Sequence, residues 1–314
     1  MKPYALTAAA LMLGSTAMAE ITTETFTFEN DGATLAGTLY YPDGWDGAAT
    51  DAVIVTGAWT SVEEQMPSLY AREMAERGLI GVTFDFRGWG KSGDLPDTGA
   101  GGRFIEDPAA KTADIRAAID HVAGLAQVGE IHGLGICASA GYMVDATRGD
   151  DRIASVGLVA PWLQDRALVE AVYGGSEGVE GLMQVAATAE AEGGQLIPAA
   201  GPEGAEGVLM PVGGYYYEAD RGAVPAYDNR WNNAGWDDWL SYHPVDGAAS
   251  FDRPLAIVHS DAAAIPDGVR AFVAALPGEA TERWLSEVTQ FDFYDRPDAV
   301  EEAADTVAAH FAAH

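Results

Sequence analysis

A strand, a sharp turn and a helix are predicted in immediate succession between residues 131 and 142. The segment reads Ile-His-Gly-Leu-Gly-Ile-Cys-Ala-Ser-Ala-Gly-Tyr, an apolar run that ends in small residues. This is the layout of a nucleophile elbow, in which the residues two positions before and after the nucleophile are small. The strained backbone of such a turn leaves no room for larger neighbours. A chain with this turn must bring a strand and the helix that follows it into close contact.

The elbow pattern fits this segment in two registers. One register centres on Cys137, between Gly135 and Ser139, and the other centres on Ser139 itself. The third residue after the nucleophile packs close to the strand and is best kept small; it is Ala140 in the first register and Tyr142 in the second. The sequence therefore favours Cys137 and keeps Ser139 as the alternative. A small-residue turn without chemistry also stays open.

The first nineteen residues have the pattern of a secretory signal peptide. A basic start at Lys2 precedes an apolar run to Leu13, and Ala17-Met18-Ala19 provides a small-residue cleavage site. We expect cleavage after Ala19 and a periplasmic or secreted protein. The apolar run is too short to span a bilayer comfortably, and no later stretch is apolar for long enough to cross one, so no membrane span is expected after cleavage.

Composition limits the partners and the redox chemistry. Asp and Glu number 48 and Lys and Arg 17, for a formal net charge of -31. Such acidity argues against nucleic acid and anionic membranes, and leaves a small-molecule substrate as the expected partner. It does not indicate an oligomeric state. The chain has one cysteine, Cys137, so an internal disulfide is impossible.

The order of predicted elements indicates an α/β fold with a mainly parallel, twisted sheet and helices on both faces. Two strands around Asn30-Asp31-Gly32 form a hairpin, and strands then alternate with helices. The alternation stops after residue 160 and resumes near residue 251. We therefore expect a core in two parts, residues 20–160 and 251–314, with a cap inserted at residues 161–250. The active site of such a sheet lies beyond the carboxyl ends of its strands.

The expected cap is rich in aromatic residues, which can line an apolar pocket or form the core of the cap itself. They are Tyr215, Tyr216, Tyr217, Tyr227, Trp231, Trp236, Trp239 and Tyr242.

With these features the chain resembles the α/β-hydrolase superfamily, and within it the dienelactone-hydrolase-like branch. The resemblance rests on Gly57 after the third strand, the Asp-x-Arg-Gly-x-Gly-x-Ser run at 85–92, the elbow at 135–141 and the loop at 261–266. Dienelactone hydrolases have a cysteine at the elbow, a position that Cys137 takes here. The resemblance implies a hydrolase of a small ester, lactone or thioester.

A triad of this superfamily also requires an acid and a histidine, in that order after the nucleophile. Asp261, in the loop after the strand 255–259, is the expected acid, and Asp165 is the second choice. The loop expected to hold the histidine contains Gln290 instead, and an amide cannot act as a general base. A cysteine depends less on a base than a serine does, which further favours Cys137.

Two groups of residues complete the expected site. The oxyanion hole requires backbone N–H groups from Ala138 and from Ala58 or Trp59. His243 and His259 are the alternatives for a base, because the other four histidines are expected in helices or inside the elbow strand.

The sequence leaves two functions of different classes open. The first is a hydrolase acting through Cys137 or Ser139, and the second is a non-catalytic protein that binds a small ligand beneath its aromatic cap. A thiol redox protein ranks last, because no second cysteine can resolve an oxidised Cys137. No cofactor is expected, and no metal site is expected from the spacing of histidines and carboxylates.

Overall fold

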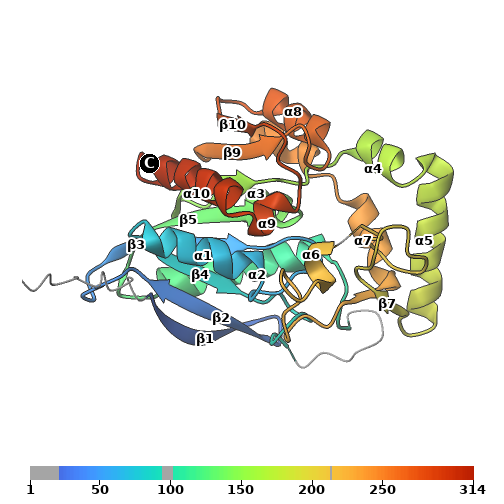
Figure 1. Ribbon diagram of the computed structural model, residues 1–314, viewed down its shortest axis with the longest axis horizontal. Coiled ribbons are helices and arrows are strands. Elements are labelled where there is room, and N and C mark those ends of the chain that lie inside the picture. Colours follow the sequence, from blue (N-terminus) through green and yellow to red (C-terminus); the bar gives the residue numbers. More distant parts are fainter. Residues whose placement is uncertain (1–20, 94–101, 213) are drawn as a thin grey trace, which may run out of the picture.

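The computed structural model describes residues 21–93, 102–212 and 214–314. The predicted signal peptide lies outside these residues. A twisted sheet of eight strands forms the centre of the described molecule, with the order β1-β2-β4-β3-β5-β6-β9-β10 (Figure 1). The strands are β1 Thr22–Asn30, β2 Ala33–Tyr41, β3 Thr50–Thr56, β4 Ile80–Phe84, β5 Val128–Ile136, β6 Ile153–Val159, β9 Leu255–Ser260 and β10 Thr281–Leu285.

Strand direction divides the sheet into a small antiparallel edge and a parallel remainder. β1 pairs with β2 and β2 with β4 in antiparallel fashion, and every other pair in this sheet is parallel. All six residues of β9 are buried, as expected for a strand covered on both faces. The carboxyl ends of the parallel strands therefore meet along one edge, where the expected site residues follow β3, β5, β9 and β10.

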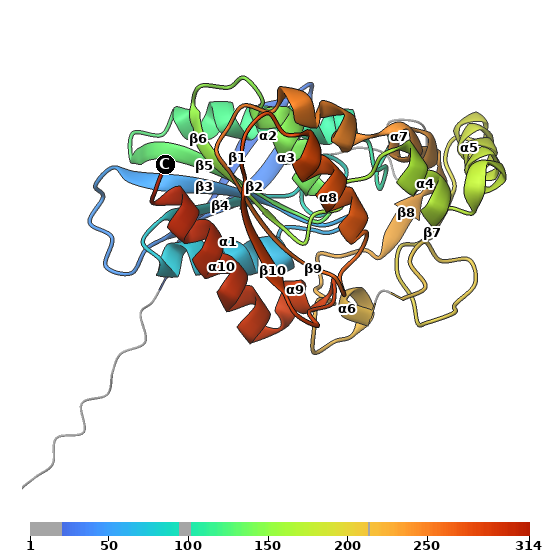
Figure 2. The ribbon, with the colours of Figure 1, turned by 90° about the horizontal axis from the view of Figure 1, so that it is seen from above.

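Helices cover both faces of the sheet. Figure 2 shows α1 and α10 on one side and α2, α3 and α8 on the other. The helices are α1 Met66–Glu76, α2 Pro108–Ala123, α3 Ser139–Thr147, α8 Pro266–Ala275, α9 Asp292–Asp295 and α10 Pro297–Phe311. This arrangement confirms the predicted fold class.

The described residues between β6 and β9 contribute no strand to the large sheet. Their elements lie at one end of the molecule, with α5 as the outermost helix (Figures 1 and 2). They are α4 Arg166–Val172, α5 Gly175–Ala191, β7 Leu196–Pro198, α6 Gly214–Tyr217, β8 Arg230–Asn232, η1 Asn233–Gly235, α7 Trp236–Ser241 and η2 Pro244–Ser250. β7 and β8 form a separate antiparallel pair. We call residues 161–250 the cap.

The described part of the chain contains no helix with the length and apolarity that a membrane crossing requires.

Candidate active site

Cys137 adopts the backbone conformation of an elbow residue. It lies between the end of β5 and the start of α3 and has a φ of +57°. Its N–H donates to the Val159 carbonyl at 3.1 Å, and its carbonyl accepts from Ala140 and Trp162. These bonds to two neighbouring segments offset the cost of a left-handed conformation in a residue with a side chain. The predicted backbone strain at Cys137 is confirmed.

Ser139 does not share this geometry. It is the first residue of α3 and is fully buried. Its hydroxyl hydrogen bonds with Thr56 Oγ1 at 2.9 Å, accepts from the Ile136 N–H and reaches the Ile136 carbonyl at 3.1 Å. The side chain therefore stabilises the turn from inside, and the left-handed elbow conformation lies at Cys137 and not at Ser139.

Three hydrogen-bond donors surround the Cys137 sulfur. The backbone N–H groups of Trp59 and Ala138 point at it, and the Tyr294 hydroxyl is the third partner. Trp59 and Ala138 are two of the residues predicted for an oxyanion hole. Ala58 instead uses its carbonyl, which accepts from the N–H and hydroxyl of Ser61 and so closes the loop.

Burial and hydrogen bonding act on the thiol in opposite directions. Burial raises the pKa of Cys137, and the contacts of Tyr294, Trp59 and Ala138 lower it without cancelling that effect. The buried carboxylate of Glu106 also raises this pKa. The thiol beneath the cap is therefore protonated over the pH range in which an ordinary cysteine begins to ionise.

Gln290 fixes the direction of the Tyr294 hydroxyl. The Ala264 N–H donates to Gln290 Oε1 at 3.0 Å, so the amide nitrogen must face the other way. Gln290 Nε2 donates to the Ala160 carbonyl at 2.9 Å and to the Tyr294 hydroxyl oxygen at 3.0 Å. With its oxygen accepting from Gln290, Tyr294 directs its O–H at the Cys137 sulfur. The sequence placed Gln290 beside the thiol, but Tyr294 lies between them.

Neither predicted acid faces this group. Asp261 pairs with Arg270 at the surface, and its side chain is 75% exposed. Asp165 is the N-cap of α4 and accepts from the Leu168 N–H at 2.8 Å. Asp261, expected as the acid of the triad, does not face the thiol, because the loop after β9 turns that carboxylate outward to Arg270 on α8.

Both alternative histidines lie elsewhere. Burial lowers the pKa of His259 to about 4, and its ring packs edge-on against Trp284. His243 lies near Asp246 at the start of η2. Among the described residues, the groups that act on the Cys137 thiol do not include a histidine.

Glu106 is a site residue that no sequence pattern singled out. This carboxylate is fully buried and accepts from Lys111 Nζ at 2.7 Å and from the Tyr142 hydroxyl at 2.9 Å. It also accepts from the N–H of Thr60, whose φ is +63°. Glu106 thereby anchors the loop that presents the Trp59 N–H. No motif connects positions 46 residues apart, so only the fold brings them together.

The cap closes over the thiol with aromatic rings. Trp59 stacks on Trp239 at 4.8 Å and packs edge-on against Trp231 at 4.9 Å. The Tyr216 hydroxyl donates to the Trp59 carbonyl at 3.3 Å. Cys137 is 5% exposed as a result. Aromatic residues of the cap thus serve both as its core and as the wall of the site.

These features have counterparts of known structure. The chain has the α/β-hydrolase fold. It superposes on the solved α/β hydrolase GrgF from Penicillium sp. with a TM-score of 0.75 at 18% identity, over 93% of this chain and 99% of that one. The crystal structure of hypothetical protein PA2218 from Pseudomonas aeruginosa gives a TM-score of 0.81 at 25% identity, over 98% of both chains.

Comparison of sequences finds similarity to two uncharacterized bacterial proteins, and no family model matches the chain. YcjY of Escherichia coli is 33% identical over 134 residues, which is 42% of this chain and 42% of that protein. PA2218 is 36% identical over 133 residues, 41% of this chain and 34% of that protein. The segments matched by sequence thus span less than half of the length of these curated relatives.

Proposed function

We propose that this protein is an exported thiol hydrolase of small esters, lactones or thioesters, with Cys137 as its nucleophile. The observation that carries the proposal is the left-handed Cys137 with two backbone N–H groups directed at its sulfur. Hydrolytic chemistry is in keeping with the α/β hydrolases that share the fold. The dienelactone-hydrolase-like branch and export remain parts of the proposal that rest on the sequence.

The first half of the reaction uses the groups at the elbow. The ionised fraction of Cys137 attacks the carbonyl carbon of the substrate and forms a carbon–sulfur bond. The N–H groups of Trp59 and Ala138 donate to the oxygen on which negative charge develops. The bond to the leaving group then breaks, and that group departs with the electron pair. The product is an acyl-enzyme on Cys137.

The second half of the reaction lacks a strong base. Water must attack the thioester, release a carboxylic acid and return the thiol, with no histidine among the described groups around the sulfur to take its proton. A tyrosine hydroxyl with a pKa well above its ordinary value, as burial gives Tyr294, cannot replace one. Acylation of Cys137 by an activated substrate should therefore be faster than hydrolysis of the acyl-enzyme.

A burst experiment tests this function. With p-nitrophenyl acetate, we expect one rapid equivalent of p-nitrophenolate per chain, followed by slow turnover, and an acetyl group on Cys137 in the intact mass. The burst rate should rise with pH, because the attacking thiolate is the minor form. Cys137→Ala should abolish the burst. Ser139→Ala, which removes a neighbouring buried hydroxyl, should retain it in folded protein.

A ligand-binding role is the second candidate, and the nearly complete burial of the thiol beneath the cap favours it. If folded wild-type protein acylates with no member of a panel of aryl esters, lactones and thioesters, the hydrolase proposal fails and this candidate replaces it.

A further inference from the structure

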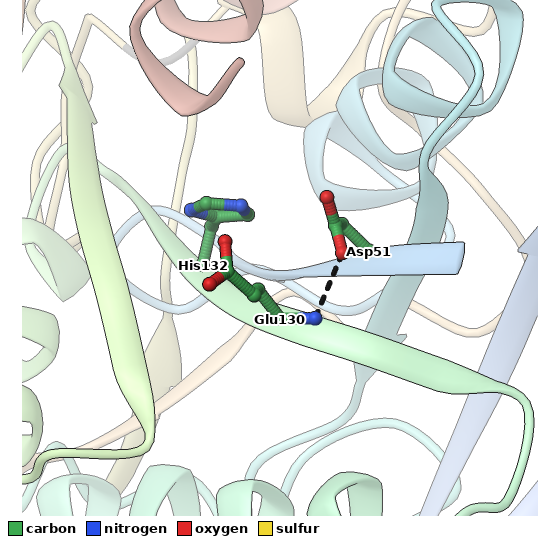
Figure 3. Close-up of side chains that lie close together, drawn as sticks. All are labelled: Asp51, Glu130 and His132. Carbon is green, nitrogen blue, oxygen red and sulfur yellow. Dashed lines mark hydrogen bonds between the residues drawn. The ribbon is translucent and has the colours of Figure 1, made fainter. Parts of the chain in front are cut away.

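We propose that Asp51, Glu130 and His132 form a binding site for a divalent transition-metal ion of the Zn²⁺ class. The three side chains lie on one face of β3 and β5, at the end of β5 remote from the elbow (Figure 3). One ligand atom from each lies within 4.8 Å of the other two. The sequence did not indicate this site, because its residues do not have the spacing of a metal motif.

Two irregularities in the sheet bring these side chains together. The pairing of β3 with β5 shifts register between Thr50 and Ala52, and Asp51 lies at that shift. Asp51 Oδ1 accepts from the Glu130 N–H at 2.8 Å (Figure 3). A Cβ at Gly129 would lie 2.5 Å from the same oxygen, so the glycine leaves room for the Asp51 carboxylate in this position. The pairing of β5 with β6 shifts next to His132. Such bulges redirect side chains.

His132 supplies independent evidence for a cation at this place. Its side chain is 1% exposed, and Nδ1 hydrogen bonds with Ser155 Oγ at 2.9 Å. The ring also stacks on Phe311 at 4.8 Å, which fixes its plane. If Ser155 accepts a hydrogen bond from Nδ1–H, Nε2 keeps its lone pair. A metal-binding imidazole has the same arrangement, with one nitrogen on the metal and the other N–H donated to a neighbouring group. Nε2 makes no hydrogen bond to a described residue, and the ring edge that carries it faces Asp51 and Glu130 (Figure 3).

The donor set selects the class of ion. An imidazole nitrogen with two carboxylates suits Zn²⁺ and related ions, whereas Mg²⁺ and Ca²⁺ prefer oxygen ligands alone. Ligand atoms around tetrahedral Zn²⁺ lie about 3.4 Å apart, given metal–ligand distances of about 2.1 Å. The exposed Glu130 side chain can swing inward to reach that spacing. Three protein ligands leave a fourth position for water.

The site lies apart from the proposed catalytic thiol. His132 and Cys137 are both in or next to β5, and five residues at about 3.3 Å each separate them by about 16 Å. A bound ion would therefore tie β3 to β5 without contacting the elbow. A surface cavity of about 460 Å³, lined in part by Glu130, gives the ion a route from solvent.

Calorimetric titration of the full chain, carrying no histidine tag and stripped of metal, tests the proposal. We expect Zn²⁺ to bind with one site per chain and to raise Tm by roughly 5 °C at saturating concentration. Glu130→Gln and His132→Gln should each weaken Zn²⁺ binding at least about tenfold. Ca²⁺ at the same concentration should bind far more weakly.

Two control variants separate this site from others that could hold Zn²⁺. Asp151→Asn removes an exposed carboxylate from the same cavity, and His314→Ala removes one ring of the His310–His314 pair, whose centroids are 4.6 Å apart. Both should bind Zn²⁺ as the wild type does. Unchanged binding in folded Glu130→Gln, loss of binding in His314→Ala, or no saturable binding by the wild type would each overturn the proposal.

Discussion

The hydrogen bond between Cys137 and its neighbouring side chain runs in the opposite direction to that of a catalytic triad. A histidine would accept the thiol proton, whereas the Tyr294 hydroxyl donates to the sulfur because Gln290 occupies its oxygen as an acceptor. Donors stabilise an anionic sulfur but cannot generate it. The site is therefore suited to hold a thiolate or an oxyanion once formed, and the ionisation itself depends on solution pH.

Removal of the Tyr294 hydroxyl tests this interpretation. Tyr294→Phe deletes a donor that lowers the pKa of Cys137, so that pKa should rise further. We expect alkylation of the thiol by iodoacetamide at about pH 8 to slow by about threefold to tenfold, since each unit of pKa is a factor of about ten in thiolate. The pH dependence of the alkylation rate measures the change.

Tyr40→Phe is the matched control, because Tyr40 is also buried and donates its hydroxyl to Ser68, in another part of the sheet. Its alkylation profile should equal that of the wild type. A Tyr294→Phe profile identical to both would mean that Tyr294 has no influence on the sulfur.

At the scale of elements, β5 and α3 lie so close together at Gly135 that a side chain at this position would clash with the helix backbone. A Cβ at Gly135 would lie 2.7 Å from the Ala140 Cα and 2.9 Å from the Ser139 carbonyl oxygen. Both neighbours are backbone atoms, which cannot move without shifting the helix. The glycine before the elbow is thus required by the packing of the following helix, in agreement with the steric argument from sequence.

Gly135→Ala should consequently displace α3 from β5. We expect a loss of about 1–3 kcal/mol in the free energy of unfolding, which guanidinium denaturation measures. The burst with p-nitrophenyl acetate should also decrease, because the Ala138 N–H moves with the helix.

Gly181→Ala provides the comparison. Gly181 lies inside α5, and a Cβ added there would meet no atom within 4 Å apart from its chain neighbours and the backbone of its own helix. Alanine should therefore stabilise the protein by about 0.5–1 kcal/mol, because it favours the helix more than glycine does. Equal stabilities for the two variants would refute the packing argument.

For the molecule as a whole, buried histidines and a buried glutamate change the free energy of unfolding in opposite directions as pH rises. Burial lowers the pKa values of His132 and His259 from 6.5 to about 4. The stability that these neutral imidazoles contribute to the folded state is therefore fully present above pH 6.5 and is lost as pH falls towards 4. Burial raises the pKa of Glu63 to about 7, and the nearby Asp85 adds to that rise. The contribution of Glu63 is complete below its unfolded pKa of about 4.3 and is lost as pH rises through about 7.

Glu63→Gln should therefore stabilise the protein at about pH 8 and have little effect at about pH 5. The gain at the higher pH should be on the order of 2 kcal/mol, because the amide avoids a buried charge whose Oε2 has no hydrogen-bond partner among the described residues. Denaturation at the two pH values measures it. Glu64→Gln, at a side chain that is 37% exposed, should show no such pH dependence, and a similar gain in both variants would contradict the assignment to Glu63.

The sequence by itself determined the α/β fold and the position of the elbow. Alternating apolar strands and helices, the hairpin turn and the small residues around Cys137 are local patterns, each readable because neighbouring residues in the chain impose them. The same steric argument favoured Cys137 over Ser139, and the oxyanion-hole layout of the superfamily that the chain resembles named Ala138 and either Ala58 or Trp59 as donors. These predictions needed no knowledge of contacts between distant segments.

Only the tertiary structure decided which side chains face the thiol. The loop after β10 winds into the short helix α9, so Tyr294, one turn beyond Gln290, reaches the sulfur. Arg270 draws Asp261 outward, and Glu106 comes from a distant loop to fix the N–H of Thr60. Side-chain directions after a strand end depend on ion pairs, burial and loop closure between segments far apart in the chain, and the local pattern of residues contains none of these.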